Sequence, residues 1–371
     1  PQAGDQYAAP GLAEALEAID AKGPAGFYEG PIAEDMAATL ALLGGPHRAA
    51  DFAGVSAERA RPLSAEAFGP DHRLTTTPPN SQGAVAHLIM AILAQAPARL
   101  LSADPFGPER LHWESEAVKL AYGARDRLLG EPSPEMDAAI AKLLAPETAA
   151  GLAAEIAPDR AAPLDAAAAR AAARYRGAPH EDTVVLSAVD RDGGACTLIT
   201  SLFNAFGTGV ASERYGVLMH SRGAGFTLKP DHPNSARPGA RPLHTMMPSL
   251  LFEKGRLRMA FGVMGGQYQA AGQAWLLGSR LRYGLDLQTA IDGPRAFPER
   301  AADAPDAAPT ERLRTERGVD DATRAALRAF GHPVRESLLP LGGAQAIEID
   351  WERGALIGAA DPRKDGCALG W

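Results

Sequence analysis

The sequence has little of what marks several large classes of protein. Two of its 371 residues are cysteines, Cys196 and Cys367, too few for a disulfide framework or a cysteine zinc site. No run approaches the roughly 20 apolar residues that a membrane-spanning helix needs. Lysine and arginine (37) are outnumbered by aspartate and glutamate (45) and do not cluster. We therefore expect no nucleic-acid or membrane partner, because binding phosphates requires a basic face.

Short motifs of several enzyme classes are also missing. The sequence contains no G-x-S-x-G nucleophile turn, no H-E-x-x-H zinc motif, no C-x-x-C pair and no G-x-x-x-x-G-K-[ST] phosphate loop. FGTG at 206–209 and GVMGG at 262–266 do not match the dinucleotide fingerprint. We therefore expect neither a cofactor nor a metal. The first residues, PQAGDQYAAPG, lack the basic start and apolar run of a signal peptide, and the compartment, cytoplasmic or periplasmic, stays open.

What the sequence has is ample material for a core, since 46% of its residues are hydrophobic. Apolar residues at helical spacing dominate the first half, and short alternating runs joined by turns dominate the second. This order favours an α+β fold over a regular βαβ repeat. The expected helices cover 12–19, 32–43, 84–95, 109–129, part of 136–173, 270–282, 287–291 and 320–330. The expected strands cover 183–190, 195–203, 216–219, 248–252, 257–262, 345–349 and 355–359, and 74–83 is expected to be a loop.

Thr183 opens the first of these strands, directly after the polar loop RYRGAPHED. Both faces of TVVLSAVD are largely apolar, which predicts a strand buried on both sides. Threonine at a strand start is usually structural. Its chemistry changes if the preceding peptide bond is cut, because a free α-amino group with a pKa near ~8 can serve as base for the hydroxyl of its own residue.

Two other segments carry polar or permissive residues at the ends of apolar strands. Gly265 and Gly266 follow LRMAFGVM; they fit a tight turn, or backbone N–H groups that approach a developing oxyanion. His244 and Thr245 lie in ARPLHTMMPSLL, where a lone histidine is more often a hydrogen-bonded structural residue than a catalyst. None of these features identifies a function alone.

Together, their order and spacing resemble the γ-glutamyltranspeptidase family of N-terminal-nucleophile (Ntn) hydrolases. GPAGFYEGPIAEDM at 23–36 is similar to a segment of the family's large subunit, and TTPPNSQG at 76–83 to its PPPSSGG loop. The run from TVVLSAVD to NAFGTGV resembles the start of the small subunit. PGARPLHTMMPSLL resembles PGKRPLSSMSPTIV, and GVMGG resembles GSPGG. YGLDLQTAIDGPRA and GAADPRKDG resemble the closing segments.

The resemblance implies a four-layer αββα sandwich that is made as a precursor and cuts itself between Asp182 and Thr183. Residues 1–182 would then be the C-terminal, mostly helical part of the large subunit, and residues 183–371 the small subunit, in one composite domain. The two pieces would stay associated and act on a small-molecule amide; their oligomeric state stays open. Family members also have a further N-terminal region, with an Arg that holds the substrate carboxylate.

By the same resemblance, Thr183 would be the nucleophile and, through its amine, the general base. Ser201 stands where the family has a Thr that supports processing and orients the nucleophile. Gly265 and Gly266 would donate the oxyanion-hole N–H groups.

The residues expected around the substrate depart from the family pattern. Phe203 replaces an Asn, Arg222 and Gly225 replace the Gln and Asp that hold an α-amino group, and His244 and Thr245 replace paired serines. Without the Asp and with an added arginine, the pocket should favour an acyl group that carries a carboxylate and no amine. The pattern resembles a divergent branch of glutathione-hydrolase-like, cephalosporin acylase-like and oxamate amidohydrolase-like proteins.

Three functions follow from these observations. The first is an Ntn amidohydrolase or acyltransferase that uses γ-glutamyl or related amides through a Thr183 acyl-enzyme. The second is an acylase or small-amide hydrolase that does not use γ-glutamyl donors. The third is an unprocessed homologue that only binds a ligand.

Overall fold

The computed structural model describes residues 2, 4–163, 181–301 and 310–371, which form two compact units. The first unit comprises residues 1–60 and 202–221, and the second comprises residues 61–201 and 222–371. The strand β4 (Ala195–Asn204) runs from the second unit into the first. No helix in the described part of the chain is long and apolar enough to cross a membrane.

The first unit is helical. It contains α1 (Pro10–Lys22), α2 (Ala25–Tyr28), α3 (Pro31–Leu42) and α4 (Ala49–Ala53), so the two helices expected here are confirmed. The Asp35 carboxylate on α3 accepts the backbone N–H groups of Arg214 and Tyr215. Tyr215 then packs in the small core of this unit. The strand expected at 216–219 is wrong: only an isolated bridge joins Ala211 to Leu218, because this segment is folded into turns around the Asp35 contact.

A six-stranded antiparallel sheet is the centre of the second unit. Its strand order is β1-β2-β5-β6-β10-β11. The strands span Leu63–Glu66, His72–Thr76, Ser249–Glu253, Arg256–Met264, Gly343–Asp350 and Ala355–Ala360. The last four correspond to expected strands. The loop expected at 74–83 is wrong for residues 74–76, which belong to β2. Leu74 is fully buried there, and β2 pairs with β5, which lies far away in the sequence.

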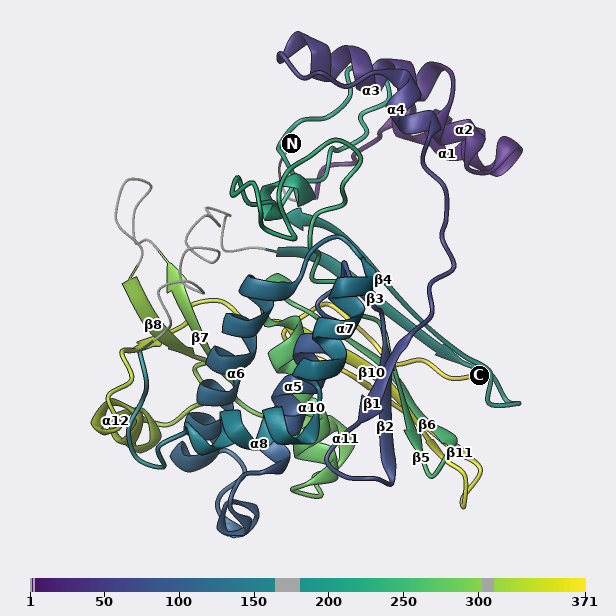
Figure 1. Ribbon diagram of the computed structural model, residues 1–371. Helices are drawn as coiled ribbons and strands as arrows, with labels where there is room; N and C mark the ends of the chain where they lie inside the picture. The colour runs from purple at the N-terminus through teal and green to yellow at the C-terminus, as the bar shows by residue number, and fades with distance from the viewer. Residues whose placement is uncertain (1, 3, 164–180, 302–309) are drawn as a thin grey trace. The chain divides into compact units, whose positions relative to one another are not determined.

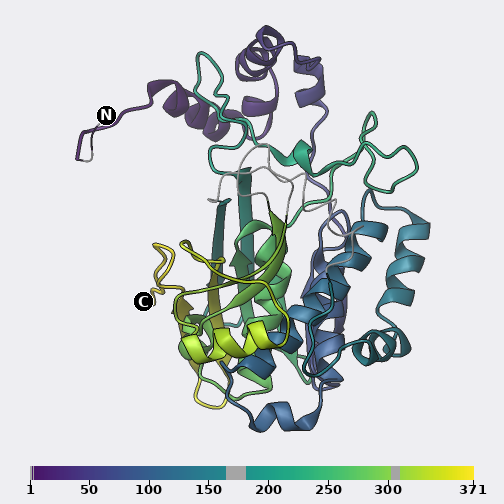
Figure 2. The same ribbon diagram turned by 90° about the vertical axis from the view of Figure 1, so that its left-hand side faces the viewer.

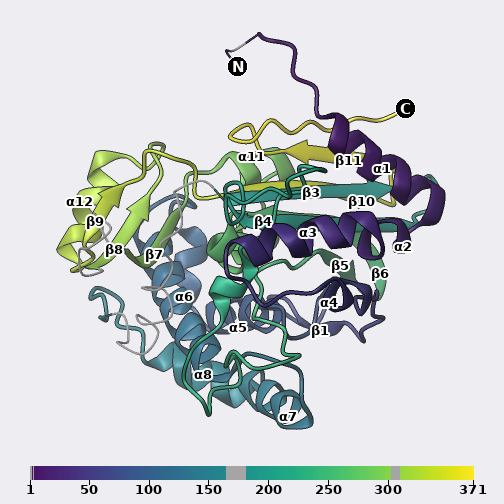
Figure 3. The same cartoon turned by 90° about the horizontal axis from the view of Figure 1, so that it is seen from above.

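Helices cover one face of this sheet (Figure 1). α10 (Gln269–Leu281) packs on β6 and against α5 (Gly83–Ala94), and α6 (Pro108–Leu128) packs against α5. The sequence of α5 is apolar on all sides, as expected for a helix enclosed by others, and ten of its twelve residues are buried. Figure 3 shows α5, α6 and α8 gathered on one side of the strands. The second unit also contains η1 (Ala98–Ser102), α7 (Pro134–Leu143), α8 (Pro146–Ala154) and α11 (Leu287–Asp292).

The hairpin of β3 (Glu181–Val189) and β4 lies on the other face of the sheet. Its inner residues Val185 and Ile199 pack on β6 at Gly262, where a Cβ would lie 2.8 Å from Val185 Cγ1. The absence of a side chain at Gly262 therefore lets the hairpin approach the sheet. Val184 and Leu186 on the outer face are 51% and 59% exposed. The expected burial on both sides is thus wrong for Val184 and Leu186.

A separate sheet of β7 (Ala296–Ala301), β8 (Thr310–Thr315) and β9 (Val334–Glu336) packs with α12 (Asp321–Ala329). These elements face the viewer in Figure 2. The sequence predicted α12, whose N-cap Asp320 accepts the Thr323 N–H, but none of the three strands. The expected α+β class is confirmed, with a helix–sheet–sheet order in the second unit. The expected helix in 136–173 is confirmed as α7 and α8, and its last part lies outside the described residues.

Candidate active site

Thr183 lies on the inner face of β3 and is buried, with 8% of its surface exposed. Its Oγ1 is 3.0 Å from Oγ of Ser201 on the neighbouring strand β4, a hydrogen-bond distance in which either hydroxyl can donate. Side chains alternate between the two faces of a strand, and the hydroxyls of Thr183 and Ser201 both lie on the inner face of the hairpin. A hydroxyl held in one direction by a neighbour is well placed for nucleophilic attack.

A small apolar cluster brings the other expected segments to the same place. It contains Val185, Ile199 and Met264, with Met246 packed against them. Each of these residues is one or two positions away from an expected site residue: Thr183, Ser201, Gly265 and Thr245. The structure therefore brings together four segments whose expected site residues lie up to 82 residues apart in the sequence, from Thr183 to Gly265.

The turn at the end of β6 carries the two glycines. Gly265 has φ +123° and Gly266 φ +47°, and the 3-10 turn η3 (Gly266–Tyr268) that they open contacts β3. A Cβ on Gly265 would lie 2.7 Å from the carbonyl oxygen of Leu341 and 2.8 Å from Cα of Gly342. Both the backbone angle and the lack of space therefore require glycine at position 265.

Arg222, His244 and Thr245 form a second group in the same unit. Arg222 opens the 3-10 turn η2 (Arg222–Gly225) and is 7% exposed. Its Nη1 donates to Oγ1 of Thr245 at 3.2 Å. Burial, and after it the charge of Arg222, lower the pKa of His244 to about 4. His244 is therefore neutral at neutral pH, and the guanidinium of Arg222 supplies the positive charge beside it.

The loop 80–82, part of the segment TTPPNSQG, holds this group in place. The His244 N–H donates to the Asn80 carbonyl at 2.9 Å, and the Gln82 N–H donates to the His244 carbonyl at 3.1 Å. Ser81 Oγ donates to the Met246 carbonyl at 2.8 Å. The sequence showed that this loop resembles a family motif, but it did not indicate that the loop pairs with the His244 segment.

Gly225 and Asn234 shape the neighbourhood of Arg222. Asn234 Nδ2 donates to the Gly225 carbonyl at 2.6 Å, and its Oδ1 accepts the Leu243 N–H at 2.8 Å. A Cβ on Gly225 would lie 2.9 Å from the Leu243 carbonyl oxygen. An aspartate could not occupy position 225 unless this backbone shifted.

Phe203, the remaining expected substrate contact, belongs to the first unit. It is buried, has φ +81°, and lies between Leu202 and Asn204, both of which bond to Ser221. A positive φ is uncommon for a bulky residue and marks local strain.

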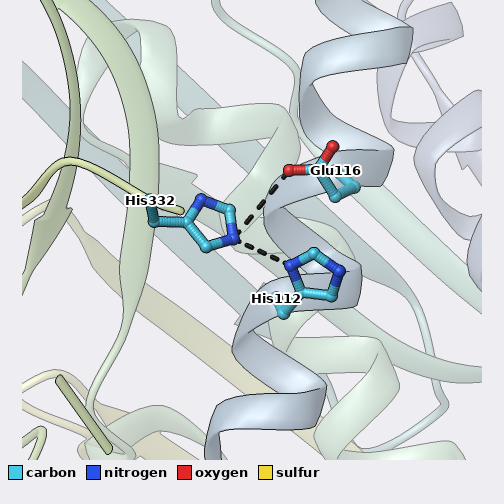
Figure 4. Close-up of side chains that lie close together, drawn as sticks. All are labelled: His112, Glu116 and His332. Atoms are coloured by element: carbon cyan, nitrogen blue, oxygen red, sulfur yellow. Dashed lines mark hydrogen bonds and ion pairs between the residues drawn. The ribbon is translucent and has the colours of Figure 1, made fainter. Parts of the chain in front are cut away.

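His112, Glu116 and His332 form a buried cluster that the sequence did not reveal, with ligand-type atoms within 4.8 Å of one another (Figure 4). His112 Nδ1 and His332 Nε2 are 2.8 Å apart, a direct hydrogen bond. Two nitrogens bound to one tetrahedral zinc at ~2.1 Å would be roughly 3.4 Å apart. The Lys119 ammonium also lies 2.8 Å from Glu116 Oε1. The described geometry therefore fits a hydrogen-bonded network that joins α6 to the residues before β9, rather than a metal ligand set.

Comparison with known proteins gives consistent matches. The sequence model of the family described as gamma-glutamyltranspeptidase matches residues 1–371. The chain is 33% identical to the glutathione hydrolase-like YwrD proenzyme of Bacillus subtilis and 32% identical to the oxamate amidohydrolase proenzyme of Klebsiella pneumoniae. Each match covers 100% of this chain and 67% of the relative.

Among solved structures, the chain is similar to cephalosporin acylase from Bacillus halodurans, with a TM-score of 0.81 and 28% identity. This match covers 100% of the chain and 64% of the acylase. The likeness agrees with the α+β fold. The chain spans about two thirds of the length of these relatives.

Proposed function

The chain belongs to the gamma-glutamyltranspeptidase family, and we propose that it forms the catalytic part of an Ntn amidohydrolase with Thr183 as nucleophile. The observation that carries this proposal is the 3.0 Å contact between the hydroxyls of Thr183 and Ser201, on a hairpin that packs beside the Gly265–Gly266 turn. Both relatives above are proenzymes, which supports a precursor here.

The first step is self-cleavage before Thr183. The Thr183 hydroxyl attacks the carbonyl carbon of Asp182; the peptide C–N bond breaks and an ester forms. Water then hydrolyses the ester, leaving a carboxylate on Asp182 and a free amine on Thr183. Residues 1–182 and 183–371 would become parts of two associated subunits.

The same hydroxyl then attacks the amide substrate. The free amine of Thr183 takes the hydroxyl proton, and Oγ1 attacks the acyl carbonyl. The N–H groups of Gly265 and Gly266 stabilise the oxyanion, and Ser201 orients Oγ1. The leaving amine takes the proton as the C–N bond breaks, and water or an amine acceptor releases the acyl group.

The substrate is an amide whose acyl group carries a carboxylate. Arg222 supplies a buried cation with planar donors, suited to a carboxylate. Gly225 leaves no space for an acidic partner to a substrate ammonium, and His244 is neutral. A buried ammonium without a partner costs several kcal/mol, equivalent to several decades in kcat/KM. The similarity to an oxamate amidohydrolase agrees with this class.

Thr183→Ala tests the nucleophile. Mass spectrometry of the full-length gene product should show a fragment that begins at Thr183 in the wild type and one uncut chain in the variant. Thr183→Ser, which keeps a hydroxyl, should still be cut. Cleavage of Thr183→Ala at the same bond would refute Thr183 as processing nucleophile, and an uncut wild type would favour a ligand-binding homologue.

Arg222→Ala tests the substrate class. The two substrates are a glutaryl amide and a γ-glutamyl amide with the same leaving group. The processed enzyme should cut the glutaryl amide with a kcat/KM at least tenfold higher, and Arg222→Ala should remove most of this preference. Arg241→Ala is the control, because Arg241 is an exposed neighbour paired with Glu131. A wild-type preference for the γ-glutamyl donor would instead support glutathione hydrolysis, since other relatives of the chain are glutathione hydrolase proenzymes.

A further inference from the structure

A buried arginine on α6 contacts the turn that carries the two glycines. Arg125 is 4% exposed, and its Nη1 donates to Oε1 of Gln267, the residue directly after Gly266. Tyr122, one helical turn earlier, donates its hydroxyl to the backbone carbonyl of Gln267. The side chain and the main chain of Gln267 are thus both fixed by α6.

The same guanidinium also contacts the segment beside Arg222. Arg125 Nη1 donates to Gln82 Oε1 at 3.1 Å. Gln82 is fully buried, its backbone N–H donates to the His244 carbonyl, and its Nε2 reaches the Thr245 carbonyl at 3.5 Å. Arg125 therefore bridges the glycine turn and the His244–Thr245 segment.

The rest of the Arg125 side chain is held rigidly. Its Nε pairs with Asp126 Oδ1 at 2.7 Å, and its guanidinium carbon lies 4.3 Å from the centre of the Tyr122 ring. Burial raises the pKa of Asp126, and the charge of Arg125 opposes that shift. Because an ion pair and a ring contact fix the guanidinium of Arg125, its hydrogen bonds also fix the side chains of Gln82 and Gln267.

Arg110 shows what a purely structural arginine on this helix does. It is 2% exposed and bonds to Glu114, to the Pro105 carbonyl and to Ser279 Oγ, each at 2.8 Å. Its partners lie on α6, on the segment before α6 and on α10, and none belongs to the candidate site. Arg125 differs in that its neutral partners Gln82 and Gln267 come from the two segments that carry the site.

We propose that Arg125 is a positioning residue for amide hydrolysis. It holds the N–H groups of Gly265 and Gly266 at a fixed place relative to the Arg222–Thr245 pair. The substrate's carbonyl, bound by the glycines, and its carboxylate, bound by Arg222, are then held at a fixed distance from each other. This proposal rests on the proposed function. A displacement of about 1 Å at a reacting group can reduce the rate by roughly 100-fold.

The experiment compares Arg125→Met with Arg110→Met in the full-length gene product. Both variants remove the arginine that pairs with a carboxylate on α6, Asp126 or Glu114, so Arg110→Met controls for the loss of such an ion pair. Amide hydrogen exchange at residues 265–268 should become at least tenfold faster in Arg125→Met and stay unchanged in Arg110→Met. The kcat of folded, processed Arg125→Met should fall by roughly 100-fold, with Arg125→Lys intermediate.

Gln267→Met keeps the proposal testable if Arg125→Met does not fold, because it removes only the side-chain acceptor. It should raise exchange at the turn and lower kcat, and the double variant should be no slower than the more affected single one. Unchanged exchange at 265–268 in Arg125→Met, or in Gln267→Met if the former is unfolded, would overturn the proposal. A wild type that cuts no amide would contradict the proposed function, while exchange at the turn would still decide the role of Arg125.

Discussion

Replacing Ser201 with alanine removes one hydrogen bond to the proposed nucleophile. Ser201 Oγ lies 3.0 Å from Thr183 Oγ1, and a bond of this kind contributes about 1 kcal/mol net. If its energy is expressed in the transition state, kcat should fall by roughly fivefold. The loss should exceed this if the freed Thr183 hydroxyl also rotates away from the attack direction.

The same hairpin offers a matched control. Ser187 Oγ on β3 lies 3.1 Å from Thr197 Oγ1 on β4, also partly buried, but away from the glycine turn. Ser187→Ala should cost similar stability and leave self-cleavage and kcat unchanged. The assay is the rate of precursor cleavage on a denaturing gel, kcat with a chromogenic amide, and the urea midpoint of each variant. Equal rates in Ser201→Ala and Ser187→Ala would refute the orienting role of Ser201.

Two further predictions concern the turn and pH. Gly265→Ala should lower the urea midpoint and reduce kcat by 100-fold or more, because the new Cβ would lie 2.7 Å from the Leu341 carbonyl oxygen. A stable, fully active variant would exclude this turn from the reaction. Burial and the charge of Arg222 lower the pKa of His244 in the folded protein to about 4. In the unfolded chain its pKa is about 6.5, so the unfolded state takes up a proton at a higher pH than the folded state does. The free energy of unfolding should therefore decrease as the pH falls from about 6.5 towards 4. His244→Gln should flatten that part of the curve of unfolding midpoint against pH, and an unchanged slope would contradict the shift.

Periodicity alone predicted most of the elements that are stabilised locally or are apolar enough to be recognised. The apolar run AVAHLIMAILAQ is the buried helix α5, and ACTLITSLF lies within β4. The strands that were missed, β1, β2, β7, β8 and β9, are short and rich in polar residues. β2 and β8 also pair with strands farther along the chain, β5 and β9, so their own sequences carry little information about that pairing.

The expected burial of both faces of TVVLSAVD is wrong for a related reason. An apolar face shows only that a side of a strand can be covered; here the inner face packs on β6, while Val184 and Leu186 on the outer face are exposed. The match covers 67% of the length of these relatives.

The sequence by itself determined the family, the α+β class and the identity of the residues proposed for catalysis, because residue types and their order along the chain are enough for those. The contact of Thr183 with Ser201, the neutrality of His244 and the link from Arg125 to the glycine turn depend on distances and burial between segments far apart in sequence. Those quantities exist only after the hairpin, the sheet and α6 have packed. Tertiary structure therefore decided how the candidate site is held and charged, since pKa values and hydrogen bonds follow from the surroundings of a residue.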